Sequence, residues 1–233
     1  MRLDRLACEA LLLTRSQSRK LIAGGKAAVN GKIVRDPAAR VDPQRDTVTV
    51  EGKACRARAP LYLMLHKPAG VVCATKDPKE ATVLSLLPDQ WRRPGLAPAG
   101  RLDKDTTGFV LLTDDGAFAH KVISPRKSVW KTYLAELDGP VTEAVAQAFR
   151  RGVVLNDGPC LPAEIRAVEG AEQTAEVRIR EGRYHQIKRM FAACGLHVIS
   201  LKRTAVGGVQ LDPALASGQA RPLTEEEKNR IVL

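Results

Sequence analysis

Two segments of this chain follow a period-two alternation of apolar and polar residues, and this pattern constrains its fold more than any other feature. Residues 132–137 and 175–180 both follow it. Such period-two alternation is typical of strands in an antiparallel sheet with one buried face and one face in water. Helical repeats at 141–149 and 184–193 do not alternate regularly with these strands. The sequence therefore predicts an α+β fold with a mainly antiparallel sheet rather than a doubly wound one.

A Pro- and Gly-rich loop at 88–100 leads into the first candidate for chemistry, Asp103. A buried strand is expected directly after it, at 109–113, and a carboxylate on a loop held by a rigid sheet is well placed to act on a ligand. By residue type alone, the better explanation is that Asp103 and Asp105 are turn residues or solvated acids. A third interpretation is that they hold Mg²⁺ for phosphate chemistry, together with Asp114 and Asp115.

A helix expected at 184–193 carries the cations that could compensate this acid. Its apolar residues place Lys188 at the edge of the buried face, from which an ammonium can reach a pocket. Arg189 falls nearly opposite that face, where we expect it to meet solvent or phosphate. We interpret His185 as a surface or capping histidine.

The positive charge of the chain is concentrated near its N-terminus. Residues 1–59 contain 13 basic and 6 acidic residues, a net of +7 out of +11 for the whole chain. An electrostatic partner for this part is expected, with nucleic acid as the leading candidate. The alternative is a basic protein that its charge keeps soluble.

The same residues have the pattern of a compact module. Helices are expected at 3–13 and 17–23, the second capped by Ser16 and ended by two glycines. Asn30-Gly31 predicts a tight hairpin, because both residues accept the positive φ of a type I′ turn. A short strand is expected at 47–50. Cations surround the second helix: Arg15, Arg19, Lys20 and Lys26.

Several signals for other chemistries are missing. The five cysteines are odd in number and lack CxxC spacing, and there is no HExxH, GxxxxGK[ST] or GxGxxG. We therefore expect reduced thiols, no metal and no cofactor. No secretory signal and no apolar run of membrane-spanning length is found, so we expect a cytoplasmic protein without a membrane partner.

The first 50–55 residues resemble the S4 RNA-binding domain. The resemblance is carried by LDRL at 3–6, SRKLIAGG at 18–25 and VNG at 29–31. In that family the second helix and the hairpin present cations to structured RNA. The resemblance implies an S4 domain with its linker over 1–59, and these RNA-binding residues: Arg5, Arg15, Arg19, Lys20, Lys26 and Asn30.

From about residue 60 to 228 the chain resembles pseudouridine synthases of the RsuA type. Four motifs carry this resemblance in order: GRLDKDTTGFVLLTDDG at 100–116, KTY at 131–133, EGRYHQIKRM at 181–190 and LKRTAVGG at 201–208. It implies a catalytic domain over 60–233, behind the S4 domain. It also implies isomerisation of uridine to pseudouridine, a reaction that neither gains nor loses atoms and requires no cofactor.

The resemblance also implies roles for single residues. Asp103 would be the nucleophile, Tyr133 would stack on the target base, Lys188 would orient Asp103, and Leu201 would pack against the pocket. Arg101, two residues before the acid, is placed among the substrate contacts, and Arg189 among the RNA contacts.

The target implied by this subfamily is 16S rRNA, free or in a partly assembled small subunit. The modification would be of the uridine 516 type, made by a monomer. Two alternatives remain: a synthase that acts on 23S rRNA, and a non-catalytic S4-type RNA-binding or ribosome-assembly factor.

Overall fold

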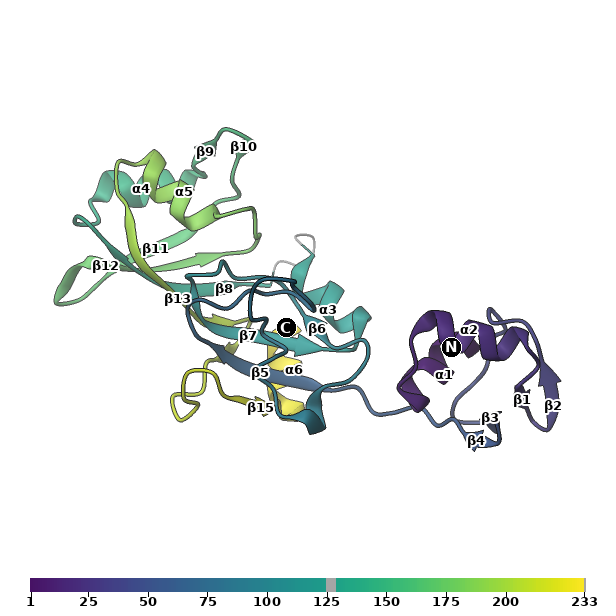
Figure 1. The fold of residues 1–233 in the computed structure, drawn as a ribbon. Helices are drawn as coiled ribbons and strands as arrows, with labels where there is room; N and C mark the ends of the chain where they lie inside the picture. The colour runs from purple at the N-terminus through teal and green to yellow at the C-terminus, as the bar shows by residue number, and fades with distance from the viewer. Residues whose placement is uncertain (125–128, 233) are drawn as a thin grey trace. The chain divides into compact units, whose positions relative to one another are not determined.

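The structure is a computed structural model that describes residues 1–124 and 129–232 (Figure 1). Its internal contacts divide the chain into two units. The first comprises residues 1–60 together with 89–96, and the second comprises 61–88 and the described residues from 97 onward. None of the described helices is long and apolar enough to cross a membrane.

The first unit contains two short helices and a small antiparallel sheet. In the sheet the strand order is β2-β1-β3-β4. The second helix begins earlier than predicted, because Thr14 rather than Ser16 caps it. The Thr14 hydroxyl accepts from the backbone N–H of Gln17, whose side chain accepts in return from the Thr14 N–H. The elements are α1 (Leu3–Leu11), α2 (Arg15–Ala23), β1 (Ala27–Val29), β2 (Lys32–Val34), β3 (Val48–Val50) and β4 (Lys53–Ala54), and η1 (Asp89–Trp91) is a single 3₁₀ turn.

The predicted hairpin at Asn30-Gly31 is confirmed. These residues join β1 to β2 with φ angles of 51° and 79°. The Asn30 side chain also ties the turn to a second loop, since its amide donates to Asp46 and its carbonyl accepts from the Thr47 N–H. Both polar groups of Asn30 therefore have partners within the unit.

A buried carboxylate stabilises the packing of the two helices. The Asp4 side chain is fully buried at the start of α1 and is ion-paired with Arg2 at 2.8 Å and with Arg19 of α2 at 3.1 Å. The hydroxyl of Ser18 also donates to the backbone carbonyl of Asp4. Hydrogen bonds from Arg2 and Arg19 hold the pKa of Asp4 well below its usual range. Apolar residues of both helices and of β1 and β3 form the core around this cluster.

The second unit is built on one large sheet. Its strand order is β11-β12-β8-β13-β7-β5-β15, with β14 paired to β13 and β6 paired to β7, while β9 and β10 form a separate hairpin (Figure 1). Only the β7–β13 pair is parallel among the described pairs. The α+β, mainly antiparallel fold is thus confirmed. The elements are β5 (Tyr62–Lys67), β6 (Ala97–Pro98), β7 (Thr107–Thr113), α3 (Gly116–Ile123), β8 (Lys131–Leu137), α4 (Glu143–Arg151), β9 (Val154–Leu155), β10 (Gly158–Pro159), β11 (Glu164–Val168), β12 (Ala171–Ile179), α5 (Gln186–Ala193), β13 (Val198–Val206), β14 (Val209–Gln210), β15 (Ala220–Pro222) and α6 (Glu225–Val232).

The alternation seen in the sequence separates the two faces of this sheet. On β8, Tyr133 and Ala135 are buried, whereas Leu134 between them is exposed. The helices α4 and α5 meet through Phe149 and Phe191, whose ring centroids lie 4.7 Å apart, and they contact β11 and β13. On the β5–β7 side, α3 and α6 contribute to a second core with Phe109 and Leu111. Buried and less buried residues therefore alternate along β8, as the period-two pattern predicted.

A glycine allows the parallel pair at the centre of the sheet to approach closely. Gly108 on β7 pairs with Arg203 on β13 and has a φ of +102°. A Cβ at this position would lie 2.2 Å from the carbonyl oxygen of Arg203, so a side chain cannot fit without moving the backbone. Gly108 thus brings the end of the Asp103 loop against β13.

Candidate active site

Asp103 lies on the loop between β6 and β7, and its side chain is 27% exposed. Two cationic or potentially cationic groups approach its carboxylate from the region of α5. His185 Nε2 is 3.6 Å from Oδ1, and Lys188 Nζ is 3.8 Å from Oδ2. The structure therefore brings together Asp103 and Lys188, which are 85 residues apart in the sequence. His185, which was interpreted from the sequence as a surface or capping histidine, also lies beside Asp103.

A buried lysine holds the Asp103 loop in place. Lys67, at the end of β5, is fully buried, and its ammonium donates to the carbonyl oxygens of Pro68 at 3.0 Å, Lys104 at 3.0 Å and Thr106 at 2.7 Å. Burial lowers the pKa of Lys67, but three carbonyl acceptors satisfy all the donors of an ammonium. The loop is further closed by a hydrogen bond from the Thr106 N–H to the carbonyl of Asp103.

This role of Lys67 was not predicted from the sequence. The available signal was a lysine followed by proline at the end of a continuous apolar strand, where a charged side chain would otherwise be expected to face water.

The hydrogen bonds of Lys188 go to Asp105 rather than to Asp103. The Lys188 ammonium lies 2.6 and 2.7 Å from the two carboxylate oxygens of Asp105. These bonds lower the pKa of Asp105. Lys188 is thus shared between two acids of one loop, and its contact with Asp103 is the longer electrostatic one.

His185 is not the capping residue that the sequence suggested. It occupies the N-cap position of α5 in the left-handed region, with a φ of 46°, and its side chain makes no capping hydrogen bond. The helix accordingly begins at Gln186, two residues later than predicted. The imidazole instead lies between Asp103 and the ring of Tyr184, on which it stacks with a centroid distance of 3.8 Å.

Tyr133 lies on β8 beside a buried arginine. It pairs with Arg203 on β13, and the Arg203 Nη1 is 3.4 Å from the phenol oxygen. Arg203 is only 3% exposed and donates from Nε to the carbonyl of Phe109 at 2.7 Å. Its Nη2 has no hydrogen-bond partner among the described residues. Sequence reasoning singled out neither Arg203, which contacts the phenol, nor the buried Lys131, which lies two residues before Tyr133 on β8.

The other predicted substrate contacts differ in their surroundings. Leu201 is buried on β13, and its carbonyl is 3.5 Å from the hydroxyl of Thr107, where the Asp103 loop enters β7. Arg101 is exposed on that loop. Arg189 is not directed to solvent as predicted, because its Nη1 and Nη2 contact Asp157 at 2.9 and 3.3 Å. Arg183 also binds Asp157, and the two arginines lower the pKa of this acid to about 2.

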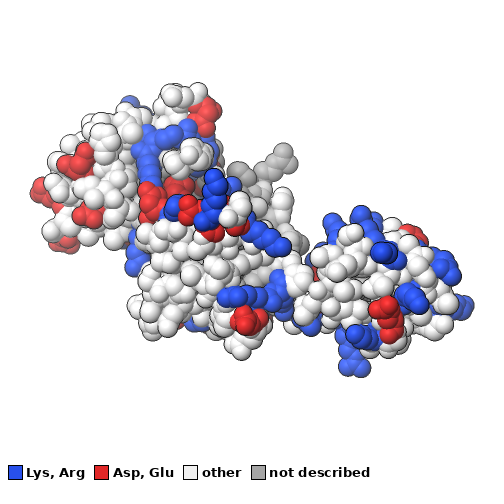
Figure 2. Space-filling view, viewed as in Figure 1, with Lys and Arg blue, Asp and Glu red and all other residues white. Residues whose placement is uncertain are grey.

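The predicted RNA-binding residues of the first unit fall into two groups. Arg19 and Arg5 have acidic partners, since Arg19 binds Asp4 and Arg5 lies 2.6 Å from Glu9. All five of these cations are exposed, including Arg15, Lys20 and Lys26, which form the second group. Figure 2 shows lysine and arginine side chains spread over the visible surface of this unit. The RNA contacts themselves stay predictions.

The acidic residues do not form the shared metal site that was considered as an alternative. Asp115 accepts from two backbone N–H groups at the start of α3, and Asp114 accepts from the N–H of Leu61. Within residues 1–124 and 129–232, no group of three or more His, Cys, Asp or Glu side chains could hold a metal ion. Asp114 and Asp115 therefore have structural roles, separate from the pair Asp103 and Asp105.

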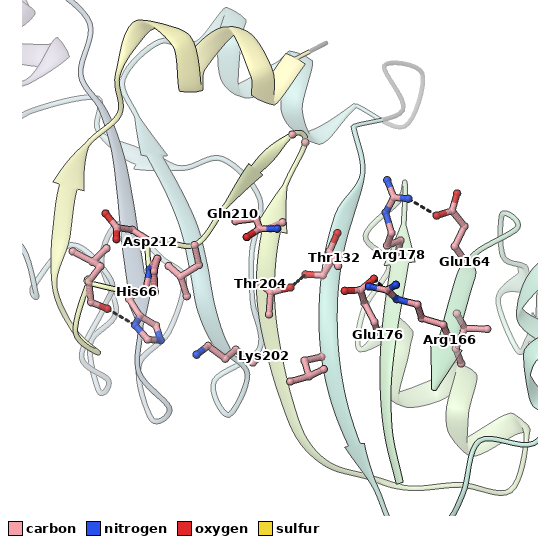
Figure 3. A pocket seen from close by; sticks show the side chains of 18 residues that line it. His66, Thr132, Glu164, Arg166, Glu176, Arg178, Lys202, Thr204, Gln210 and Asp212 are labelled. Carbon is pink, nitrogen blue, oxygen red and sulfur yellow. Dashed lines mark hydrogen bonds and ion pairs between the residues drawn. The ribbon is translucent and has the colours of Figure 1, made fainter. Parts of the chain in front are cut away.

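A groove of about 780 Å³ opens on the face of the sheet that bears Leu134, Lys202 and Thr204 (Figure 3). Tyr133 and Arg203 alternate with these residues along β8 and β13, so they belong to the opposite face. Two cross-strand ion pairs line the groove, Arg166 with Glu176 and Arg178 with Glu164. Because these charges cancel and none of the predicted substrate contacts lines it, we do not assign the groove to the site.

The arrangement suits chemistry at a carboxylate. Asp103 is a partly exposed acid on a fixed loop beside a lysine and a histidine, and the same unit contains the buried Tyr133. These groups suit nucleophilic attack on a bound base. The basic helical module that precedes this site in the chain suits RNA. The fold and site thus define an RNA-modifying enzyme.

Comparisons with known proteins identify the family. Residues 61–193 match the family described as RNA pseudouridylate synthase, and residues 1–46 match the S4 domain. The chain is 43% identical over 236 residues to ribosomal small subunit pseudouridine synthase A of Escherichia coli K12, with all of both chains covered. It is 41% identical over 230 residues to the uncharacterised RNA pseudouridine synthase YtzG of Bacillus subtilis, with 97% of this chain and 96% of that protein covered.

A solved structure described as a pseudouridylate synthase is also similar. It matches over the whole of both chains, with a TM-score of 0.70 and 38% identity. The chain therefore belongs to the RNA pseudouridine synthase family, whose members are isomerases, and it carries an N-terminal S4 domain. The family and the RsuA-type resemblance predicted from the sequence are confirmed.

Proposed function

We propose that this enzyme isomerises one uridine of 16S rRNA, of the uridine 516 type, with Asp103 as the nucleophile. The observation that carries the proposal is the setting of Asp103. Its carboxylate is 27% exposed, lies 3.6 Å from His185 and 3.8 Å from Lys188, and sits on a loop that the buried Lys67 holds at the carbonyls of Lys104 and Thr106.

The reaction needs no external reagent. The N1–C1′ glycosidic bond breaks, the uracil turns within the pocket, and a C5–C1′ bond forms. The proton on C5 leaves and N1 gains one, so atoms and electrons balance. Asp103 acts as a covalent nucleophile in this scheme, and Lys188 compensates its negative charge. The expectation that neither metal nor cofactor takes part stays a prediction.

The target uridine must leave the RNA stack to reach Asp103. Extrusion of a base costs a few kcal/mol. We assign to the Tyr133 ring the stacking that offsets part of this cost, about 1–3 kcal/mol for one base on an aromatic ring. Leu201 would form an apolar wall of the same pocket, since it is buried on the neighbouring strand β13.

The small-subunit target rests on the relatives and on charge. The Escherichia coli relative is named a ribosomal small subunit pseudouridine synthase, and it matches over its full length. The net charge of +7 in residues 1–59 would attract folded RNA, either free or in a partly assembled subunit. We further propose a monomer that works in the cytoplasm, with a domain boundary at residues 59 and 60.

Release of tritium from RNA labelled at C5 of uridine tests the reaction. The wild-type enzyme should release tritium from 16S rRNA and not from 23S rRNA, and EDTA should have no effect. The Asp103→Asn variant should lose activity, whereas Asp114→Asn, whose carboxylate binds the Leu61 N–H, serves as a matched control. If Asp103→Asn keeps the wild-type rate, Asp103 is not the nucleophile.

Mapping of pseudouridines tests the target. Loss of one pseudouridine from 16S rRNA in a deletion strain, restored by the wild-type gene and not by Asp103→Asn, would support the proposal. A site lost from 23S rRNA would favour a large-subunit enzyme. An inactive protein that still binds pre-ribosomal RNA would support the assembly factor.

A further inference from the structure

An exposed aromatic ring lies one residue from the group that contacts the proposed nucleophile. The Tyr184 side chain is 76% exposed, although its ring stacks on His185 with an interplanar angle of 17°. His185 Nε2 in turn lies 3.6 Å from Oδ1 of Asp103. The Asp103 carboxylate, the His185 imidazole and the Tyr184 phenol therefore lie one after another from the site out into solvent.

The backbone on both sides of Tyr184 is fixed. The Gln186 side chain accepts from the Arg183 N–H at 2.9 Å and donates to Glu181 at 2.6 Å, which closes the turn that contains Tyr184. Arg183 is anchored in addition by Asp157 and by the carbonyls of Gly158 and Pro159. His185 covers one face of the phenol ring. The ring is thus held in position, with most of its surface free to bind a flat partner.

The chemistry of the substrate indicates what that partner is. When the target uridine leaves the stack, each neighbouring base loses a stacking partner and exposes a π-face. An aromatic side chain recovers such a face without regard to sequence. We propose that Tyr184 stacks on the nucleotide next to the target uridine in the RNA strand and so holds the strand open at Asp103. This inference rests on the proposed function.

The exposure of Tyr184 can be compared with that of other exposed apolar residues of the second unit. Val154 and Ile199 are 72% and 64% exposed, and isolated residues of this kind are common on protein surfaces. They are aliphatic, and within residues 1–124 and 129–232 no hydrogen bond, ion pair or ring contact joins either of them to His185 or Asp103. Tyr184 differs because it is aromatic, is already stacked on one face and is adjacent to the site. Ile199→Ala is therefore a suitable control for the loss of an exposed apolar side chain.

The test uses the full-length enzyme and 16S rRNA transcripts that contain the mapped uridine. Tyr184→Ala should lower kcat/KM about 5- to 150-fold, as expected for the loss of one base–aromatic stack of about 1–3 kcal/mol. Tyr184→Phe and Tyr184→Trp should stay near the wild-type value, because they keep the ring. Ile199→Ala should also leave kcat/KM unchanged.

Substrates with one abasic nucleotide, either 5′ or 3′ of the target, separate stacking from an indirect effect. On the abasic RNA that lacks the stacked base, the kcat/KM of wild type should fall by about the factor that Tyr184→Ala shows on intact RNA. The kcat/KM of Tyr184→Ala should not fall further on that abasic RNA. If Tyr184→Ala acted only through His185 and Asp103, it would instead lower kcat/KM by the same factor on both abasic RNAs as on intact RNA. Equal losses on intact and abasic RNA would overturn the inference, as would a loss in Tyr184→Phe equal to that in Tyr184→Ala.

The two proposals fail in different ways. If wild-type enzyme forms no pseudouridine in 16S rRNA, the proposed function is wrong. The same variants and abasic substitutions, made in the RNA that the enzyme does modify, then test the stacking role. If wild type modifies 16S rRNA and Tyr184→Ala matches it, only the role of Tyr184 is wrong.

Discussion

The ammonium of Lys188 is bound closely by Asp105, at 2.6 and 2.7 Å, and lies 3.8 Å from Asp103. One cation thus serves two acids on the same loop. Asp105 fixes where the ammonium sits, and from that position the positive charge acts on the carboxylate of Asp103. This relationship distinguishes the roles of the two acids and leads to the first prediction.

Removal of the Lys188 charge should impair catalysis far more than removal of Asp105. Lys188→Met leaves two acids with no ammonium between them, and we expect kcat to fall about 100-fold or more. Lys188→Arg should restore part of the loss. Asp105→Asn should cost less than about 10-fold, because Lys188 can still pair with Asp103. Single-turnover measurement of pseudouridine formation checks the order, and a wild-type kcat in Lys188→Met would contradict the role of Lys188.

Lys67 should prove to be a positioning residue. In Lys67→Met the carbonyls of Pro68, Lys104 and Thr106 lose their shared donor, and the Asp103 loop loosens. We expect kcat to fall about 10- to 100-fold, since such supporting contacts hold a catalytic group in its productive geometry. Affinity for RNA should change less than about twofold, because Lys67 is fully buried.

The control for Lys67 lies on the same loop. Lys104→Met removes an exposed ammonium that lies 2.8 Å from Glu80, and kcat should not change. Thermal unfolding of both variants separates a loosened loop from an unfolded domain. A Lys67→Met enzyme that folds and keeps full kcat would show that the loop does not need this clamp.

Burial of Lys131 should make the second unit less stable at neutral pH. Burial lowers the pKa of Lys131 from 10.5 to about 8. Between these two pH values, the unfolded chain therefore binds one proton more than the folded chain does. The free energy of unfolding should therefore rise with pH from about 8 to 10.5. Lys131→Met should be more stable than wild type at pH 7 by about 2 kcal/mol, with the difference vanishing near pH 10.5. Chemical denaturation at several pH values measures this, and a constant difference would contradict it.

Asp4 should be essential for the stability of the first unit. Its folded pKa is depressed, so its contribution is fully present above the unfolded pKa near 3.9 and is lost as the pH falls through the folded value. Asp4→Asn should cost about 2–4 kcal/mol, because Arg2 and Arg19 lose a buried partner. Glu9→Gln, which breaks a more exposed pair with Arg5, should cost less than about 1 kcal/mol. Hydrogen exchange within residues 1–55 measures both effects.

The exposed lysines of the first unit should set the salt dependence of RNA binding. If Lys20 and Lys26 each contact one phosphate, replacing both by alanine should reduce the slope of log affinity against log salt by about 1.5. The rate constant at saturating RNA should not change. Arg166→Ala is the control. Arg166 lines the groove on the sheet of the second unit, and its charge is already paired with Glu176. An unchanged slope would remove these two residues from the RNA-binding face.

Local patterns in the sequence determined much of the fold. Asn30-Gly31 predicted a turn because the φ preferences of two residues suffice for it, and the period-two pattern along β8 predicted a strand with one buried face. The catalytic motif and the S4 signature predicted the family for a similar reason, since short runs of residues carry them. The N-cap of α2 was misplaced by two residues, because Ser16 and Thr14 are both good capping residues and the mutual hydrogen bonds with Gln17 decided between them.

The tertiary structure alone decided the environment of Asp103. Lys67 comes from the end of β5, and His185 and Lys188 come from the start of α5, and no local pattern states that they meet the Asp103 loop. Packing of β5, β7 and β13 places Lys67 beneath the loop, and the left-handed backbone of His185 turns its ring from a capping position toward Asp103. Hydrogen bonds and ion pairs depend on distances of a few ångströms between residues remote in sequence, and only the folded sheet sets those distances.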